Sequence, residues 1–142
     1  MSVTVITGSW AELGAAASAI RHQVFVVEQQ VPLELELDAF DAVSLHALAT
    51  DGDTALGTGR LLPDGHIGRM AVRREARGAG IGSMLLHALM RQAQQRGDAA
   101  VVLHAQLSAV GFYRRHGYEP EGAVFMDAGI EHIAMRHTFS PG

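Results

Sequence analysis

The chain has 142 residues, of which 48% are apolar, so its length suits one domain (residues 1–142) with a proper hydrophobic core. It contains no cysteine, which excludes disulfides, thiolate metal sites and cysteine nucleophiles. A net charge of −4 argues against nucleic acid as a partner, no apolar run reaches the roughly 18 residues of a membrane span, and the first residues lack the features of a signal peptide, so we expect a cytoplasmic protein.

The first half of the chain predicts a strand, a helix and three further strands. Residues 3–7 form a short β-branched run, and Ser9 is suited to cap a helix that continues to about Arg21. The β-branched run 24–27 leaves the end of this helix open, and residues 33–43 appear acidic and irregular. Three strands are then expected, separated by the turns 51–53 and 63–65: residues 44–50, 55–62 and 66–72.

The second half predicts a long helix that ends at about Arg96, followed closely by a buried strand over 99–105. A strand, a helix and a strand in this order imply a parallel pair with a right-handed crossover. A short helix capped by Ser108 is expected over 108–116, and two strands, 123–126 and 132–138, flank the turn 127–129. These elements predict an α+β fold with a mixed sheet.

A glycine-rich stretch, Arg77-Gly78-Ala79-Gly80-Ile81-Gly82-Ser83, lies between the third of these strands and the long helix. Glycines let the backbone turn tightly and approach a ligand closely. The first N–H groups of a helix are unpaired and lie at the positive end of its dipole. The stretch therefore predicts an anion site for a phosphate or pyrophosphate. The alternative is a plain strand-to-helix connection with solvated arginines.

Charge is distributed unevenly along the chain. All basic residues are arginines, and none lies between Arg21 and Arg60, whereas seven acidic residues do. Arginines gather instead around the glycine-rich stretch and at 114–115. This favours an anionic cofactor on one side and a cationic partner on the other, although two solvated faces would give the same pattern.

Two further segments make the anion site more specific. The first, residues 106–118, contains Ala109, Phe112, Tyr113, Arg115, Gly117 and Tyr118 at the spacing A-x-x-F-Y-x-R-x-G-Y, and the second is the run VFVVEQ at 24–29. Together with R-x-x-G-x-G at 77–82 they resemble the GNAT superfamily of acetyl-CoA-dependent acyltransferases. Asp38, Asp41 and G-I-x-H-I-x-M at 129–135 resemble its small bacterial ElaA/YjcF-like subgroup.

The resemblance implies a three-layer fold, with helices on both faces of a mostly antiparallel sheet, and acetyl-CoA as cosubstrate. The backbone of residues 78–83 would bind the pyrophosphate, and Arg77 would add a charge-assisted hydrogen bond. The pantetheine arm would lie beside residues 70–72 and hydrogen-bond to their main chain as an added strand. The residues implied in cofactor binding are Met70, Ala71, Val72, Arg77, Gly78, Ala79, Gly80, Ile81, Gly82, Ser83, Gln106, Phe112 and Arg115.

The resemblance further implies direct attack of an amine on the acetyl thioester, without a covalent enzyme intermediate. Tyr113 matches the tyrosine that protonates the departing thiolate; a core-packing role is the alternative. The proton acceptor is left open between Glu28, which is the only charge in an apolar run, His132 in the G-I-x-H motif, and a water chain. A backbone N–H near residues 70–72 is the expected oxyanion donor.

The acceptor is expected to be a small primary amine. Glu28, Asp38 and Asp41 would hold it as a cation, unless these carboxylates are simply solvated. No metal spacing is evident among the eight histidines, and a homodimer is compatible with such folds. Two rival functions are a non-catalytic acyl-CoA-binding module and a nucleotide binder, but the stretch lacks the Lys-Ser/Thr ending of a P-loop.

Overall fold

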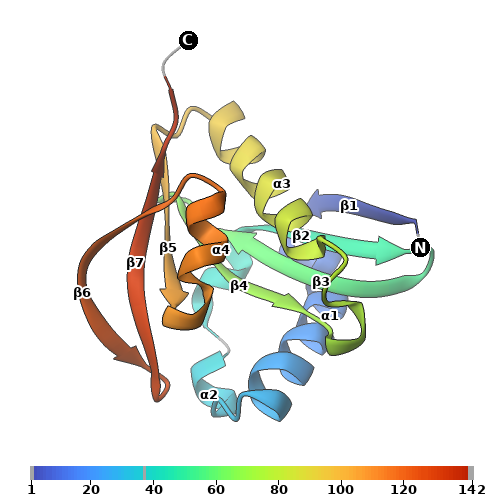
Figure 1. The fold of residues 1–142 in the computed structure, drawn as a ribbon. Helices are drawn as coiled ribbons and strands as arrows, with labels where there is room; N and C mark the ends of the chain where they lie inside the picture. Colours follow the sequence, from blue (N-terminus) through green and yellow to red (C-terminus); the bar gives the residue numbers. More distant parts are fainter. Residues whose placement is uncertain (1, 37, 141–142) are drawn as a thin grey trace.

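The computed structural model describes residues 2–36 and 38–140, which are arranged around one seven-stranded sheet (Figure 1). The strand order is β1-β2-β3-β4-β5-β7-β6, and only β4 and β5 pair in parallel. The predicted mixed, mostly antiparallel sheet with a central parallel pair is therefore confirmed. The strands are β1 (Val3–Gly8), β2 (Leu45–Asp51), β3 (Thr54–Leu61), β4 (His66–Val72), β5 (Ala100–Gln106), β6 (Glu119–Asp127) and β7 (Ile130–Thr138).

Helices cover both faces of the sheet, as predicted. α1 (Trp10–Arg21) lies on one face, while α3 (Ile81–Gln95) and α4 (Val110–Arg115) lie on the other (Figure 1). Side chains of β2 alternate between the two layers: Leu48 packs in the cluster that contains α1 residues, and its neighbours Ala47 and Ala49 pack in the cluster that contains α3 residues. The period-2 pattern of a strand thus serves two hydrophobic layers.

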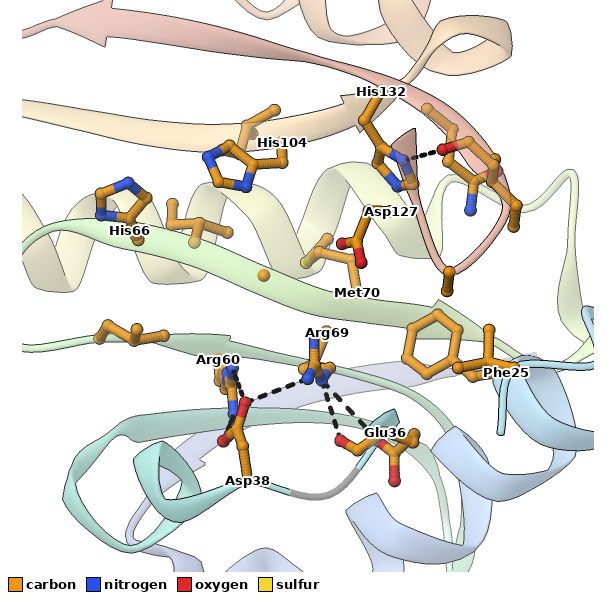
Figure 2. A pocket seen from close by; sticks show the side chains of 18 of the residues that line it. Phe25, Glu36, Asp38, Arg60, His66, Arg69, Met70, His104, Asp127 and His132 are labelled. Carbon is orange, nitrogen blue, oxygen red and sulfur yellow. Dashed lines mark hydrogen bonds and ion pairs between the residues drawn. The ribbon is translucent and has the colours of Figure 1, made fainter. Parts of the chain in front are cut away.

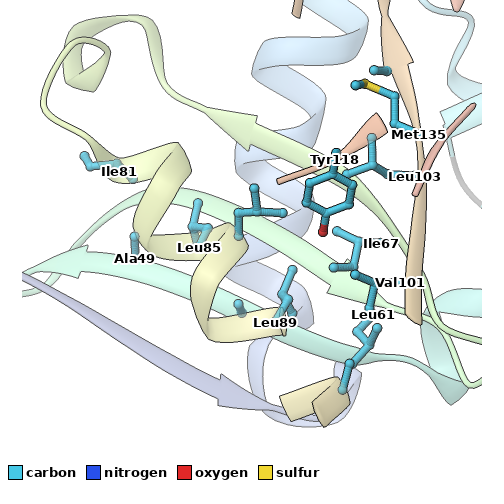
Figure 3. Close-up of a cluster of buried hydrophobic side chains, with 14 of the residues drawn as sticks. Ala49, Leu61, Ile67, Ile81, Leu85, Leu89, Val101, Leu103, Tyr118 and Met135 are labelled. Atoms are coloured by element: carbon cyan, nitrogen blue, oxygen red, sulfur yellow. The ribbon is translucent and has the colours of Figure 1, made fainter. Parts of the chain in front are cut away.

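The main core is built on α3. Its buried residues Ile81, Leu85 and Leu89 recur at helical spacing and face the sheet, where Tyr118 and Met135 complete the cluster (Figure 3). Full burial of such a side chain contributes about 1.5–3 kcal/mol. The position of the first turn of α3, and with it the glycine-rich stretch, is therefore set by this core.

The first helix behaves as predicted at its start and changes form at its end. Ser9 and Glu12 form a reciprocal capping box. After Arg21 the chain continues as a π-helix over His22–Glu28, where the N–H of Gln29 donates to the carbonyl of Val24. The open question at residues 24–27 is thus answered by a wider helix, a form that often occurs at functional sites.

The acidic segment after Pro32 is more regular than expected. It contains a short helix α2 (Leu33–Glu36) and a 3₁₀ turn η2 (Ala39–Val43), for which Asp38 is the N-cap. Ion pairs with arginines of other elements hold this segment, as described below, and such tertiary contacts are not visible in local propensity.

Two further expectations about the second half need correction. Ser108 does not cap the short helix: it lies in a 3₁₀ turn (Leu107–Ala109), and α4 begins at Val110 without a side-chain cap. β6 is also longer than predicted, and a register shift between Glu121 and Phe125 interrupts its pairing with β7. Within the described residues, no helix has the length and apolar character to cross a membrane.

The parallel pair opens into a cleft. β4 and β5 pair only at His66 and Ile67, opposite Val102 and Leu103, and diverge beyond that point. A β-bulge on β4 adds to the distortion, because Arg69 and Met70 together face the single residue Gly59 of β3. Arg69 has a φ of 47°, and a Cβ at Gly59 would lie 2.5 Å from the Met70 sulfur. A side chain at this position would therefore require the Met70 side chain to shift.

Candidate active site

Two hollows adjoin one another along β4 and α4. The larger has a volume of about 620 Å³ and lies in the opening between β4 and β5, where Met70, Gln106 and Tyr113 are among its lining residues. The smaller has a volume of about 320 Å³ and is lined by Val72, Phe112 and the glycine-rich stretch. Consecutive residues of α4, Phe112 and Tyr113, thus face different hollows, which places the anion site next to the cleft.

The glycine-rich stretch has the geometry of an anion site. Gly78 and Gly80 have φ values of 87° and 78°, which only glycine adopts without strain. Gly80 is the N-cap of α3 and offers no side-chain cap, and the first intrahelical bond runs from Met84 to Gly80. The amides of residues 81–83 therefore have no partner within the helix. Ile81, Gly82 and Ser83 all line the small hollow, and Ala79 is exposed.

Arg77 connects this stretch to the strand and to the π-helix. Its Nε donates to the Val72 carbonyl at 3.0 Å, and its terminal nitrogens lie 3.0 and 3.1 Å from the two carboxylate oxygens of Glu28. Arg74 also lies 3.7 Å from Glu28. The Glu28 side chain is only 13% exposed and lines neither hollow. The structure thus places Glu28 as the partner of the Arg77 guanidinium.

The cleft side of β4 presents its main chain. The N–H of Arg73 donates to Leu56 of β3, and main-chain groups of successive strand residues point to opposite edges. The main chain of Val72 therefore points away from β3, which agrees with the hydrogen bond from Arg77 to its carbonyl. Ala71, by contrast, pairs with Thr58 and buries its side chain against the α1 layer.

Tyr113 lies on the wall of the cleft, in contact with Phe112 and Tyr118 at ring-centroid distances of 5.1 and 5.8 Å. Burial raises the pKa of the Tyr113 phenol, so the hydroxyl keeps its proton through the neutral range. Gln106, which also lines the cleft, donates to the side chain of Gln29 at 3.2 Å. This contact joins the π-helix to β5.

His132 reaches the cleft from β7. Its Nδ1 lies 2.8 Å from the Ile130 carbonyl, and because a carbonyl only accepts, Nδ1 carries the proton (Figure 2). The Nε2 of the neutral ring is therefore a proton acceptor. His66 and His104 line the same cleft, and burial together with the neighbouring His66 and His132 lowers the pKa of His104. No described group of three or more histidines and carboxylates is placed to hold a metal ion.

Asp41, which was expected to hold the substrate, lies in a buried ion-pair network and does not line the cleft. Asp41 is only 4% exposed and accepts hydrogen bonds from Arg21 at 2.7 and 3.1 Å and from Arg60 at 2.9 Å. Arg21, which is 1% exposed, also pairs with Glu36. Burial alone would raise the pKa of Asp41, but the hydrogen bonds and charges of Arg21 and Arg60 outweigh it and lower this pKa.

Asp38 lines the cleft but is neutralised in the same network. Its two oxygens accept from Arg60 at 2.7 and 2.9 Å, and Arg69 of the bulge lies 3.0 Å away (Figure 2). These arginine contacts, of which the hydrogen bond from Arg60 is the strongest, lower the pKa of Asp38. Three arginines from α1, β3 and β4 thus balance the three carboxylates of residues 36–41. Part of the uneven charge pattern along the sequence therefore reflects an internal ion-pair network.

Asp127 is a cleft residue that the sequence did not single out. It lies at the turn between β6 and β7, and its side chain is directed into the cleft near His132 (Figure 2). No described residue forms an ion pair or hydrogen bond with its carboxylate. The sequence indicates this residue only as part of a turn, because its position next to His132 depends on the register of the hairpin. Arg115, in contrast, is exposed on α4 and lines neither hollow.

Comparison with known proteins fits this geometry. Residues 14–139 match the model of an acetyltransferase (GNAT) domain. The uncharacterized N-acetyltransferase YjcF of Bacillus subtilis is 39% identical over 120 residues, which cover 82% of this chain and 86% of YjcF. The crystal structure of an acyl-CoA N-acyltransferase from Pseudomonas aeruginosa is 31% identical, with a TM-score of 0.87 over 96% of this chain and all of that one. Escherichia coli ElaA is 27% identical, with a TM-score of 0.86 over 96% of this chain and 99% of ElaA. The chain therefore belongs to the GNAT family of acetyltransferases.

Proposed function

We propose that this protein transfers the acetyl group of acetyl-CoA directly to a primary amine of a small molecule. The observation that carries the proposal is the adjacency of the two hollows. An anion site at the start of α3 opens beside a cleft that contains a protonated phenol and a proton-accepting imidazole. The description of the Pseudomonas aeruginosa relative as an acyl-CoA N-acyltransferase supports the same donor class.

In this proposal the diphosphate of CoA binds the amides of residues 78–83 and the guanidinium of Arg77. The pantetheine arm runs from the small hollow into the cleft and pairs with the main chain of Met70 and Val72. Its length brings the thioester to the wall on which Tyr113 lies. Gln106 and Phe112 flank the arm, whereas Arg115 lines neither hollow and the Ala71 side chain is buried in the α1 layer.

The chemistry then needs proton movements at the nitrogen and at the sulfur. The bound ammonium first gives a proton to Nε2 of His132, directly or through a water molecule, and the neutral nitrogen then attacks the thioester carbon. A main-chain N–H of β4 stabilises the oxyanion. The C–S bond breaks as the Tyr113 hydroxyl donates its proton to the departing sulfur, and Tyr113 regains a proton through water from the nitrogen that becomes the amide. We favour His132 over Glu28 as the acceptor, since Glu28 lies outside the cleft and is paired with Arg77.

The acceptor amine is drawn to the cleft by Asp127. The cleft carboxylates Glu36 and Asp38 pair with arginines, and Asp64 accepts a hydrogen bond from the His66 amide. Asp127 has no such partner among the described residues, so we take it as the group that attracts a cation. Apolar neighbours such as Phe25 and Ile130 favour an amine with an apolar body. A carboxylate close to the reacting amine would be disfavoured by Asp127.

A panel of small amines, assayed by release of the free thiol of CoA, tests this function. We expect turnover with amines that lack a carboxylate, and the Tyr113→Phe variant should lower kcat by about 10²- to 10⁴-fold. His22→Gln, an exposed change on the π-helix, serves as the control. Tight binding of acetyl-CoA without thiol release over the whole panel would instead support the non-catalytic acyl-CoA-binding alternative.

A further inference from the structure

A chain of hydrogen bonds leads from the anion site to the surface. The Ser83 hydroxyl, in the first turn of α3, lines the small hollow and lies 3.0 Å from Nε2 of His116. Nδ1 of His116 lies 3.1 Å from Nε2 of His87, which is exposed one turn further along α3. The two rings meet at 4.8 Å between centroids, and Phe112 packs against His116 at the same distance. None of the steps of acetyl transfer described above uses these two histidines.

We propose that His116 and His87 position the Ser83 hydroxyl for the cofactor's diphosphate and couple the binding of that diphosphate to the uptake of a proton. The inference rests on the proposed function, because it takes the diphosphate of CoA as the ligand. His116 and His87 are positioning residues, since Ser83 is the group that touches the ligand.

The donor and acceptor pattern decides where the hydroxyl proton of Ser83 points. If Nδ1 of His116 donates to His87, the bare Nε2 of His116 accepts the hydroxyl proton, and Ser83 cannot donate into the small hollow. If the proton between the two rings belongs to His87, Nε2 of His116 carries a proton and donates to Ser83. The hydroxyl proton is then available. Diphosphate oxygens only accept, so the ligand selects the second arrangement.

A further proton on the pair gives the same result with an added charge. The imidazolium of His116 donates at both nitrogens, to Ser83 and to His87, and leaves the hydroxyl proton for the ligand. It also places a positive charge one side chain away from the diphosphate. Both effects strengthen the bound state, so diphosphate binding raises the pKa of His116.

In the free protein His116 is neutral, so it can take up a proton when the diphosphate binds. Partial burial lowers the pKa of His116, and the neighbouring charges of His87 on α3 and Arg115 on α4 lower it further. These are the described titratable or charged groups that act on the ring. Because His87 is exposed, it can exchange the proton with solvent. Binding should therefore take up a proton near neutral pH and become weaker as the pH rises.

Isothermal titration calorimetry in buffers of different ionisation enthalpy measures this proton uptake directly. Dephospho-CoA is the probe, since it keeps the diphosphate and lacks the phosphomonoester that itself titrates at a pKa of about 6. We expect net proton uptake by the wild-type protein at neutral pH. The dissociation constant should increase with pH by about tenfold for each unit by which the ligand raises the pKa of His116.

Three variants separate positioning from structure. His116→Gln keeps a polar side chain but cannot take a proton, so proton uptake should disappear. Ser83→Ala removes the hydrogen-bonded link to the ligand but leaves the charge effect of the histidine pair, so proton uptake should be reduced. His22→Gln should behave as the wild type. Binding of dephospho-CoA without proton uptake, or equal uptake in His116→Gln, would refute the coupling and leave the proposed function intact. Absence of binding of CoA or dephospho-CoA to the wild type would refute both.

Discussion

Replacing Asp41 with asparagine should destabilise the fold without a selective effect on substrate binding. The carboxylate accepts two hydrogen bonds from Arg21 and one from Arg60, and both Asp41 and Arg21 are almost completely buried. Removal of one partner from a buried ion pair typically costs 3–5 kcal/mol. Glu36 and Asp38 still pair with the two arginines, so we expect about 3 kcal/mol, or a decrease in melting temperature of about 10 °C.

Urea unfolding measures this cost. Trp10 is the single tryptophan, and its ring lies 5.3 Å from the Arg21 guanidinium carbon, so its fluorescence reports on the network. The pKa of Asp41 is lowered in the folded state, so its contribution is present at neutral pH and is lost as the pH falls through the folded pKa. Asp41→Asn should lack that acid-dependent loss. Asp53→Asn, in an exposed turn, is the matched control.

If Asp41→Asn unfolds at the same urea concentration as Asp53→Asn but raises the KM for the amine, the carboxylate contacts the substrate. The buried network would then not be the reason for its presence.

Two further predictions concern the ligands. Asp127→Asn should raise the KM for the amine by about tenfold, equivalent to roughly 1.4 kcal/mol, with little change in kcat. Glu131→Gln, a change at an exposed residue of the same hairpin, should leave both KM and kcat unchanged. An unaltered KM in Asp127→Asn would rule out its role as the cation anchor. Gly80→Ala and Gly97→Ala both place a Cβ at positive φ and should each cost about 1–2 kcal/mol of stability. Only Gly80→Ala should also raise the KM for acetyl-CoA. Equal KM values in both variants would contradict the anion site at the start of α3.

Local patterns in the sequence determined a large part of this protein. Ser9 and Glu12 specify the start of α1, and the apolar spacing from Ile81 to Leu89 specifies α3 and its buried face. These signals act between residues three or four positions apart, so they can be recognised without knowledge of the rest of the chain. The glycines at 78 and 80 likewise indicated an anion site because their backbone freedom is a local property.

Only the tertiary structure decided how the charged residues are used. Asp41 meets Arg21 and Arg60 across 20 and 19 residues of sequence, respectively, and Glu28 meets Arg77 across 49. Asp127 and His132 enter the cleft because the β6–β7 hairpin adopts one particular register and lies beside the opening between β4 and β5. Whether a carboxylate is neutralised or free depends on which cation lies within about 4 Å, and that distance is set by packing between elements that local sequence does not encode.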